Sequence, residues 1–342
     1  MASLREKAKD LFERLKTARR VLVTSEPYPD GDALGAEIAL GEIARYAFKL
    51  APGGPAGQQV YLVNEKGCPR KYRFLAGADR IRRLDTLLEK DFDLGIVVDG
   101  GSERAGAAKE IFDRCPFRVL VDHHKMGSRE RYDLALNDPE SSSTTQILWT
   151  FFGDPGIGVP LTREAAEAIY LGIIFDTGSF QYSLTKPESH EIASRLLAAG
   201  IDFSRIAERA LLVQEYGEIK VLGTVLASVR RTSNGEIVWG WLTHETMRQL
   251  DVSGDDLSKI IQILCFVEGT KVALLFREIE DGRFKVSLRS RGEVDVARVA
   301  RELDPQGGGH DRAAGCTLEG DLEGVVHRTV KHIEGKLAET RR

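Results

Sequence analysis

Cysteine is scarce in this sequence, and long apolar runs are missing. The four cysteines, Cys68, Cys115, Cys265 and Cys316, are scattered without paired spacing, so the sequence predicts a reduced, cytoplasmic protein rather than a disulfide framework. No apolar run approaches the ~18 residues that a helix needs to cross a bilayer. The amphipathic start "MASLREKAKDLFERLK" also lacks the apolar core of a secretion signal. We therefore expect no membrane partner.

An excess of positive charge is missing as well. The chain has 48 Lys and Arg residues against 52 Asp and Glu residues, which gives a formal net charge of −4. This balance argues against a protein that tracks along a long nucleic acid. A small phosphorylated ligand, held in a local basic pocket, is compatible with it.

The first half of the chain alternates short apolar runs with helical segments. Between Arg20 and Asp138 the runs are "VLVTS", "QVYLVN", "LGIVVD" and "RVLVD". Continuous runs of β-branched residues are typical of strands buried on both faces, as in a parallel sheet covered by helices. The sequence predicts an α/β domain here.

The second half has a different pattern, so we expect two domains. A chain of 342 residues exceeds the size at which one core usually stops growing, and domains of roughly 150 residues are typical. Strand-like "GEIVWGWLTHE" and "KVALLFREIEDGRFKVSLRS" are followed by a glycine cluster, which indicates a smaller α/β domain. We predict a first domain at residues 1–186, a helical linker at 187–214 and a second domain at 215–342.

Carboxylates and histidines follow several of the predicted strands. They are Glu26, Asp30 and Asp32 after the first strand, Asp99 after "GIVV", and Asp122, His123 and His124 after "VLV". Ligands of open parallel sheets bind beyond the carboxyl ends of the strands, so these groups are expected at one edge. A further carboxylate, Asp176, opens the turn "DTGSF" and could reach the same place.

Each of these pieces has an ordinary alternative. Asp-Gly is common in turns, an aspartate after a strand often caps a helix, and adjacent histidines can be surface residues. Their convergence on one sheet edge favours a cluster of ligands instead.

The ligand types indicate which ion such a cluster would hold. Oxygen ligands with one or two imidazoles and no cysteine suit Mn²⁺ or Mg²⁺ more than structural zinc. The set is too rich for one ion. Two ions that share a carboxylate would activate a water and clamp the oxygens of a phosphoryl group. The sequence predicts a two-metal phosphoester hydrolase.

On these motifs the sequence resembles the DHH phosphoesterases, in the branch that has a C-terminal DHH-associated domain. The motifs are "PDGDA" (29–33), "VVD" (97–99), "DHH" (122–124), "DTGSF" (176–180), "VSLRS" (286–290) and "GGGHDRAAG" (307–315). The resemblance covers nearly the whole chain. It is greatest to the small enzymes of the family that hydrolyse very short oligoribonucleotides and, often, 3'-phosphoadenosine 5'-phosphate (pAp).

The resemblance implies cofactors, partners and roles. The cofactors would be two Mn²⁺ ions, with Mg²⁺ as the alternative, and the partners would be short RNA or small phosphorylated nucleotides. A homodimer is left open. Position by position, Asp30 would bind one ion, Asp32 would bind the other, Asp99 would bridge both, and His123 and Asp176 would complete the second site. His124 would face the scissile phosphate, with Asp122 orienting the histidine pair.

One position departs from the family pattern. Where the family usually reads Ser-His-x-x-Pro-Asp, this chain has Ser25-Glu26-Pro27-Tyr28-Pro29-Asp30. Glutamate can also ligate Mn²⁺, and Glu26 is therefore a candidate ligand of the first ion. The alternative is that Glu26 turns away and leaves the first site weak.

The second domain is expected to hold the rest of the substrate. Gly307, Gly308 and Gly309 lack β-carbons, so their amides can approach a phosphate or ribose, and His310 can donate to the same anion. Arg289 offers a planar fork for phosphate, and the resemblance implies that Ser290 binds beside it. Arg104, just after Asp99, is another candidate for the phosphate. A flexible glycine hinge and an exposed arginine at a helix start are the alternatives.

The predicted function is the release of nucleoside monophosphates from very short RNA, with pAp as a second candidate substrate. Two other functions stay open. One is a nucleotide-binding or weakly active relative whose first metal site is altered at Glu26. The other is a phosphodiesterase that acts on linear or cyclic dinucleotides.

Overall fold

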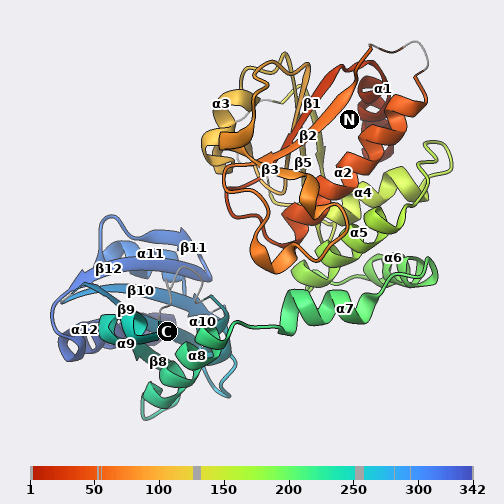
Figure 1. Ribbon diagram of the computed structural model, residues 1–342. Coiled ribbons are helices and arrows are strands. Elements are labelled where there is room, and N and C mark those ends of the chain that lie inside the picture. Colours follow the sequence, from red (N-terminus) through yellow and green to blue (C-terminus); the bar gives the residue numbers. More distant parts are fainter. Residues whose placement is uncertain are drawn as a thin grey trace. The chain divides into compact units, whose positions relative to one another are not determined.

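The computed structural model describes residues 3–51, 54, 56–125, 132–250, 258–280, 282–292 and 294–340. The chain divides into two compact units, Met1–Val213 and Gln214–Arg342. Figure 1 shows that each unit has its own sheet with helices packed on it.

The sheet of the first unit has six strands in the order β3-β2-β1-β4-β5-β6. Every neighbouring pair is parallel. The strands are β1 (Arg20–Thr24), β2 (Gln59–Asn64), β3 (Ile81–Arg83), β4 (Leu94–Val98), β5 (Phe117–Asp122) and β6 (Leu134–Asn137). The predicted parallel α/β fold is confirmed.

Helices cover both faces of this sheet. They are α1 (Leu4–Thr17), α2 (Gly31–Lys49), α3 (Lys109–Phe112), α4 (Thr144–Gly153), α5 (Arg163–Asp176), α6 (Pro187–Ala198) and α7 (Phe203–Ala207). Apolar residues of α1, α2, α4 and α5 form one core with residues of alternate strand positions, such as Val21 and Val23. The intervening position, Leu22, belongs to a smaller core with Phe112 of α3 on the other face. The buried strand runs that the sequence displays follow from this double cover.

The order of the strands decides where a ligand can bind. The chain builds outward from β1 to β2 and β3, then returns to place β4 on the other side of β1. The loops that leave β1 and β4 therefore diverge at their carboxyl ends, and such a reversal point is where open parallel sheets bind ligands. This point lies directly before Glu26 and Asp99.

The segment predicted as a linker, residues 187–214, packs with the first unit. Ile192, Ala193 and Leu196 of α6 are buried in the same core as α5, as are Ile206 of α7 and Ala210 of the following π-helical turn Glu208–Leu212. The compact unit accordingly extends to Val213.

The sheet of the second unit also has six strands, in the order β11-β12-β10-β9-β8-β7. They are β7 (Arg230–Arg231), β8 (Ile237–Leu242), β9 (Val272–Glu280), β10 (Arg283–Ser290), β11 (Gly308–His310) and β12 (Ala313–Glu319). All pairs are antiparallel except β8 with β9. The second unit is therefore α/β, as predicted, with a mixed sheet.

Five helices belong to this unit within the described residues, and they cover its sheet unequally. They are α8 (Tyr216–Ser228), α9 (His244–Leu250), α10 (Ser258–Cys265), α11 (Val296–Leu303) and α12 (Leu322–Thr340). Residues of α11 and α12 pack across one face, on Leu274, Val286 and Ala314. Residues of α8 and α10 pack on the other face over β8 and β9, and α10 also contacts β10. Among the described residues, no helix of either core packs over β12 and β11 on that face.

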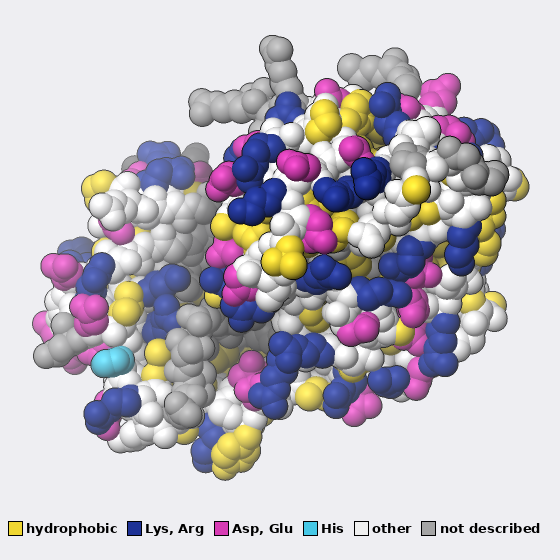
Figure 2. All heavy atoms as spheres, turned by 45° about the horizontal axis from the view of Figure 1, so that its top comes forward, with side chains coloured by type: hydrophobic (Ala, Val, Ile, Leu, Met, Phe, Trp, Pro, Cys, Tyr) yellow, Lys and Arg dark blue, Asp and Glu magenta, His cyan; other side chains and the backbone are white. Residues whose placement is uncertain are grey.

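The surface mixes charges of both signs. On the face drawn in Figure 2, lysine and arginine side chains lie among aspartate and glutamate side chains over the described residues, in keeping with the formal net charge of −4. None of the helices in the described part of the chain has the length and apolarity that a membrane span requires.

Candidate functional site

The acidic motifs meet because β1, β4 and β5 are neighbours. Thr24 of β1 pairs with Val97 of β4, and Val98 of β4 pairs with Val121 of β5. Asp99 follows in a left-handed conformation, with φ of 56°, while its amide still donates to the Val121 carbonyl at 3.0 Å. Aspartate is among the few residues other than glycine that tolerate this region. The turn ends the strand and directs the carboxylate into the site, where such local strain is common.

Two aspartates of the first motif stand at the start of α2. Asp30 is the N-cap, because its Oδ1 accepts from the amides of Asp32 and Ala33, both at 3.0 Å. The ordinary alternative of a helix cap thus holds for Asp30, although its Oδ2 is not used in this cap. Asp32 points instead toward the start of α4 and is fully buried.

The start of α4 holds Asp32 by three hydrogen bonds. The Thr144 amide donates to Asp32 Oδ2 at 2.6 Å, and the Thr145 amide and hydroxyl donate to Oδ1 at 3.0 and 2.8 Å. The Thr144 hydroxyl donates to Asp99 Oδ1 at 3.1 Å. Sequence reasoning missed both threonines. The signal that could have found them is the hydroxyl-rich run "SSSTT" before an apolar helix.

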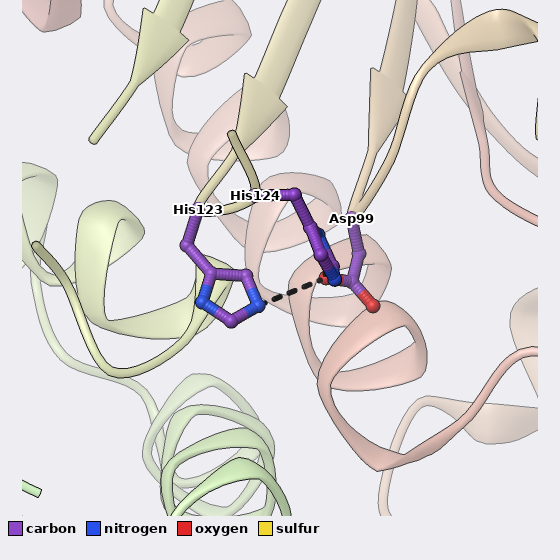
Figure 3. Close-up of side chains that lie close together, drawn as sticks. All are labelled: Asp99, His123 and His124. Atoms are coloured by element: carbon purple, nitrogen blue, oxygen red, sulfur yellow. Dashed lines mark ion pairs between the residues drawn. The ribbon is translucent and has the colours of Figure 1, made fainter. Parts of the chain in front are cut away.

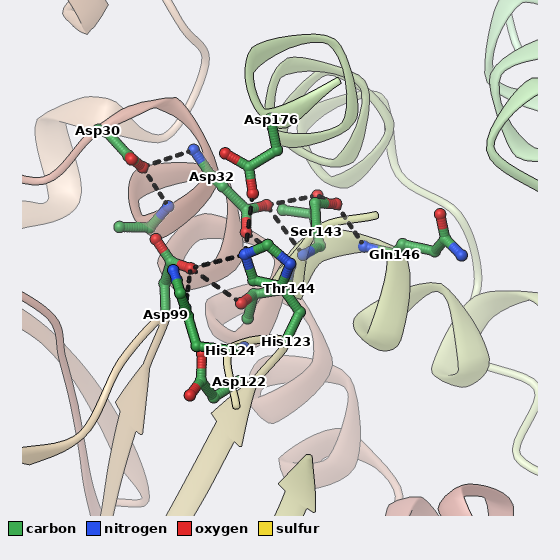
Figure 4. A network of polar contacts seen from close by, with 12 residues as sticks. Asp30, Asp32, Asp99, Asp122, His123, His124, Ser143, Thr144, Gln146 and Asp176 are labelled. Atoms are coloured by element: carbon green, nitrogen blue, oxygen red, sulfur yellow. Dashed lines mark hydrogen bonds and ion pairs between the residues drawn. The ribbon is translucent and has the colours of Figure 1, made fainter. Parts of the chain in front are cut away.

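His123 connects the carboxylates of the site. Its Nε2 lies 3.0 Å from Asp176 Oδ2 and 3.6 Å from Asp99 Oδ1. Ligand atoms of Asp32, Asp99, His123 and Asp176 all lie within 4.8 Å of one another. Figure 4 shows these side chains converging from α2, β4, β5 and α5. The structure thus brings four of the six predicted metal ligands into one group.

His124 lies on the exposed side of this group, where Figure 3 shows it beside Asp99 and His123. Its Nδ1 is 2.8 Å from Asp122 Oδ1, which also accepts from the His124 amide at 3.0 Å. Asn137 of β6 fixes the loop by donating to the carbonyls of Asp122 and His124, at 2.7 and 2.8 Å. Asn137 was also missed by sequence reasoning, because its partner loop is more than ten residues away in sequence.

The carboxylates repel one another strongly. Burial, and then the charges of Asp32, Asp30 and Asp176, hold the pKa of Asp99 well above its ordinary value. Burial and the charge of Asp32 raise the pKa of Asp176 to about 7. Burial alone would lower the pKa of His123, but its hydrogen bond to Asp176 and the charge of Asp32 outweigh it and raise that pKa to about 9.

A divalent cation fits this environment. Buried carboxylates that repel one another need a counter-charge, and hard divalent ions take carboxylate oxygens as ligands. Ligands of Mg²⁺ at ~2.1 Å from the ion lie no more than ~4.2 Å apart, close to the spread of Asp32, Asp99, His123 and Asp176. The donor set contains no thiolate, which agrees with the predicted preference for Mn²⁺ or Mg²⁺ over structural zinc.

The structure does not bring Glu26 into the four-residue group. Its Oε2 lies 2.7 Å from an Arg104 guanidinium nitrogen, and Arg104 is about half exposed. Burial opposes the charge of Arg104, yet the pairing with Glu26 and the nearby charges of Asp99 and Asp30 raise the pKa of this arginine. The two residues form a charge pair at the rim of the acidic site.

In the second unit, Arg289 and His310 share one face of the sheet. Both residues pair with Ala313, which lies between them on β12, and directly opposed residues in antiparallel strands point to the same side. Their strands are two spacings, or ~10 Å, apart. Two positions further along β12, Ser287 and Gly308 flank Gly315 in the same way. Small residues therefore lie beside a cation and an imidazole on the part of this face that is formed by β10, β12 and β11.

Ser290 does not join them. It follows Arg289 directly and so points to the opposite, core-facing side, where it is buried. Its hydroxyl accepts from the Gly292 amide at 3.1 Å. Ser287, two residues before Arg289, lies on the same face as Arg289.

The three glycines of "GGGH" differ in what they permit. A β-carbon on Gly307 would lie 2.6 Å from the Ala300 carbonyl oxygen, and one on Gly309, at φ of 141°, would lie 2.3 Å from the Ala313 carbonyl oxygen. Both glycines are thus required by packing within the unit. A β-carbon on Gly308 would meet no atom within 4 Å. Within the part of the chain that the structure describes, the space next to Gly308 is therefore open.

The chain matches known domains and proteins over nearly its whole length. Residues 20–173 match the DHH family, N-terminal domain, and residues 234–339 match the DHHA1 domain. A protein from Thermus thermophilus described as "Bifunctional oligoribonuclease and PAP phosphatase NrnA" is 29% identical, with 97% of this chain and 95% of that protein covered.

Two crystal structures share the fold. An exopolyphosphatase-related protein from Bacteroides fragilis has a TM-score of 0.82 at 24% identity, with 98% of this chain and 96% of that chain covered. RecJ from Thermus thermophilus in complex with Mn²⁺ has a TM-score of 0.53 at 16% identity, with 98% of this chain and 55% of that chain covered. The predicted enzyme class, a hydrolase of phosphoester bonds, is confirmed at the level of the family. The chain therefore contains a DHH N-terminal domain followed by a DHHA1 domain.

Proposed function

We propose that this protein hydrolyses very short oligoribonucleotides to nucleoside monophosphates, and also pAp, with two Mn²⁺ ions as cofactors. The observation that carries the proposal is the buried group of Asp32, Asp99, His123 and Asp176, whose ligand atoms lie within 4.8 Å of one another. The relative from Thermus thermophilus is named for both activities, and the RecJ structure contains Mn²⁺.

In this proposal the acidic residues divide between two ions. Asp99 would serve both ions, Asp32, His123 and Asp176 would hold the second, and Asp30 would hold the first. When bound, such ions would supply an activated water and neutralise the charge on the oxygens of the phosphoryl group. The proposed role of Glu26 is to position Arg104 at the rim of the site, since its Oε2 lies 2.7 Å from a guanidinium nitrogen of Arg104. Arg104 there offers its remaining guanidinium donors to the phosphate.

His124 is proposed to contact the scissile phosphate rather than an ion. Its Nδ1 is engaged by Asp122 at 2.8 Å, so Nε2 is the nitrogen left to face a substrate. Burial would raise the pKa of Asp122, but hydrogen bonds from the His124 ring and amide outweigh it and lower that pKa. The ionised carboxylate favours a protonated Nδ1 and fixes the orientation of the ring.

The second unit is proposed to recognise the rest of the nucleotide. Arg289 and His310 flank the small residues Ala313 and Gly315 on one sheet face. Burial lowers the pKa of Arg289, but a guanidinium remains charged at neutral pH. Phosphate or ribose oxygens could bind these two side chains and the open backbone at Gly308. A distance of about 10 Å between their two strands suits one or two nucleotides more than a long strand.

Turnover with Mn²⁺ tests the proposal directly. The substrates are pApA, pAp, a 24-residue RNA and a cyclic dinucleotide, with Asp99→Asn as the inactive control. We expect release of AMP from pApA and pAp, and much slower attack on the 24-mer. Similar rates on pApA and the 24-mer would contradict the preference for short RNA. Faster attack on the cyclic dinucleotide would favour the phosphodiesterase alternative. Nucleotide binding without turnover would favour the alternative of a nucleotide-binding protein.

A further inference from the structure

The amino end of α4 lies between the two most deeply buried carboxylates of the site. Thr144 and Thr145, the first two residues of this helix, together donate four hydrogen bonds, three to Asp32 and one to Asp99. More than one hundred residues separate Asp32 from these threonines in sequence. All four side chains are buried. Figure 4 shows Thr144 within the network beside Asp32, Asp99 and His123.

The two amide bonds satisfy free N–H groups at the start of the helix, but the two hydroxyl bonds are not needed to cap it. Ser143 is the N-cap, since its hydroxyl accepts from the Gln146 amide at 3.1 Å. The Ser143 and Thr145 hydroxyls are 2.8 Å apart. Because a carboxylate only accepts, the Thr145 hydroxyl must donate to Asp32, and it can then accept from Ser143. The hydroxyls of Thr144 and Thr145 thus donate to the carboxylates of Asp99 and Asp32.

The hydrogen bonds from the threonines leave different numbers of lone pairs free on Asp32 and Asp99. An ionised carboxylate has about four acceptor positions on its two oxygens. From the described residues, Asp32 accepts two hydrogen bonds on Oδ1 and one on Oδ2, which leaves one position on Oδ2. Asp99 accepts a single hydrogen bond, on Oδ1, which leaves positions on both oxygens. Asp32 can therefore offer one oxygen to an ion, whereas Asp99 can offer both.

The surrounding helices are packed to permit this arrangement. A β-carbon on Gly172 of α5 would lie 2.2 Å from the Thr145 hydroxyl and 2.3 Å from Asp32 Oδ1. A β-carbon on Gly35 of α2 would lie 2.4 Å from the Ala168 carbonyl oxygen and 3.1 Å from the Thr145 methyl group. Both glycines allow α2, α4 and α5 to approach closely around the Asp32–Thr145 contact.

We propose that Thr144 and Thr145 are positioning residues which restrict Asp32 to one-oxygen ligation of a single ion and align Asp99 to bridge two. The proposal rests on the proposed two-metal function. The α4 amides and hydroxyls act on the carboxylates, and neither threonine contacts the substrate. Because Asp32 and Asp99 differ in the lone pairs that remain free, Thr144 and Thr145 should differ in their effect on metal binding. The Thr145 hydroxyl affects the binding of one ion through Asp32, and the Thr144 hydroxyl affects the binding of both ions through Asp99.

Mn²⁺ binding to the metal-free, full-length protein tests this without any substrate. Valine has nearly the shape of threonine but cannot donate, so the variants are Thr145→Val and Thr144→Val. The matched control is Thr150→Val on the same helix, six residues from Thr144. Thr144→Ser and Thr145→Ser keep the hydroxyl donors. Titration calorimetry measures the number of ions and each affinity, and thermal unfolding of each metal-free variant shows whether it is folded.

The expected results differ between the two threonines. Loss of an outer-shell partner typically weakens metal binding by about 10- to 100-fold. We expect Thr145→Val to weaken one of two Mn²⁺ binding steps by about this factor and Thr144→Val to weaken both. The serine variants and Thr150→Val should stay within about threefold of the native protein, well below that outer-shell effect.

Several outcomes would overturn the proposal. Native binding of two ions together with unchanged affinities in both valine variants would refute the positioning role and leave the proposed function intact. Fewer than two ions in the native protein would defeat both. If a valine variant does not fold, Gly172→Ala carries the test. It keeps both hydroxyls but displaces the Asp32–Thr145 contact, so it should weaken one step, and unchanged binding would again refute the role.

Discussion

In the first unit, Asp32, Asp99 and His123 are 0%, 5% and 8% exposed, whereas in the second unit His310 is exposed and Arg289 partly so. Asp32 and Asp99 of the buried acidic group are fixed by four hydrogen bonds from the amino end of α4. The open sheet face offers a cation, an imidazole and small residues. A reaction requires atoms held within a fraction of an ångström, whereas binding a nucleotide tolerates more freedom. Substitutions in the two regions should therefore differ in which kinetic constant they change.

The largest effect is expected from Asp99. Asp99→Asn keeps the shape of the side chain but removes the charge that two ions share, so kcat/KM should fall by more than about 100-fold. Calorimetry should show that Mn²⁺ binding is lost while the thermal unfolding of the metal-free variant is preserved or improved, because one repelling charge is gone. Substantial activity at saturating Mn²⁺ would contradict the bridging role.

His124 tests whether the acidic site also has a residue devoted to the substrate. Removing a donor that stabilises charge in the transition state typically costs about 100-fold in kcat, and we expect a loss of this order for His124→Ala. Both Mn²⁺ ions should still bind, because His124 lies on the exposed side of the cluster. Loss of an ion in this variant would make His124 a ligand instead.

Arg289 tests the other side of the comparison. If Arg289 binds substrate and transition state alike, Arg289→Ala should raise KM by about tenfold, the value of a typical hydrogen bond to a charged group, with kcat nearly unchanged. Ser290→Ala is the matched control, since its side chain faces the core. A larger change in kcat than in KM would move Arg289 into the chemistry.

We expect the stability of the first unit to depend on pH, because its buried carboxyl groups and His123 have shifted pKa values. A carboxyl group whose pKa is raised by folding binds its proton more tightly when folded, so ionisation lowers stability as pH rises from about 4 toward about 7 for Asp176 and about 8 for the buried Glu37. His123 contributes stability below its unfolded pKa that is lost as pH rises through about 9. All three effects have the same sign.

Without metal, the Tm of the first unit should therefore fall between pH 5 and 9 by at least about 3 °C. Scanning calorimetry at several pH values checks this. Mn²⁺ should raise Tm most at high pH, because ligands must be deprotonated to bind metal. Glu37→Gln should remove only the Glu37 share of the slope. A metal-free Tm that rises with pH would show that the carboxylates are ionised at little cost.

Glu26 should have the smallest effect. Because its carboxylate pairs with Arg104 at the rim, Glu26→Gln should change Mn²⁺ affinity by less than about threefold, below the loss expected for a ligand or its direct partner. Glu26→His places an imidazole where the family usually has one and should strengthen the binding of the first ion. Loss of one ion in Glu26→Gln would instead identify Glu26 as a ligand.

Much of the fold was readable because it depends on short segments. The buried strands and the acidic residues that follow them are local patterns, and the carboxyl ends of parallel strands necessarily lie at one edge. This is why Asp99, His123 and His124 were expected near the first acidic loop, and why Asp176 was a plausible addition. The DHH and DHHA1 motifs carried the domain types in the same way.

The particular contacts of the site depend on segments that are distant in sequence. Nothing in the motif "PDGDA" indicates that Thr144 and Thr145 approach Asp32, because that contact requires α2, α4 and α5 to pack around Gly35 and Gly172. The pairing of Glu26 with Arg104 likewise joins two loops, one after β1 and one after β4, that only the strand order makes neighbours. The side of β10 on which Ser290 lies could not be predicted either, for a simpler reason. A strand alternates its faces, and only the sheet shows which face is covered.

By itself, the sequence determined which residues are available for chemistry and which end of the first sheet would present them, since strand periodicity and motif spacing are local properties of the chain. Tertiary structure decided which lone pairs of Asp32 and Asp99 remain free, that Glu26 has a partner other than the acidic cluster, and which side of β10 is open. These outcomes depend on close packing between elements, where a single β-carbon on Gly172 would displace the contact between Asp32 and Thr145, and such packing is a property of the assembled unit rather than of any one segment.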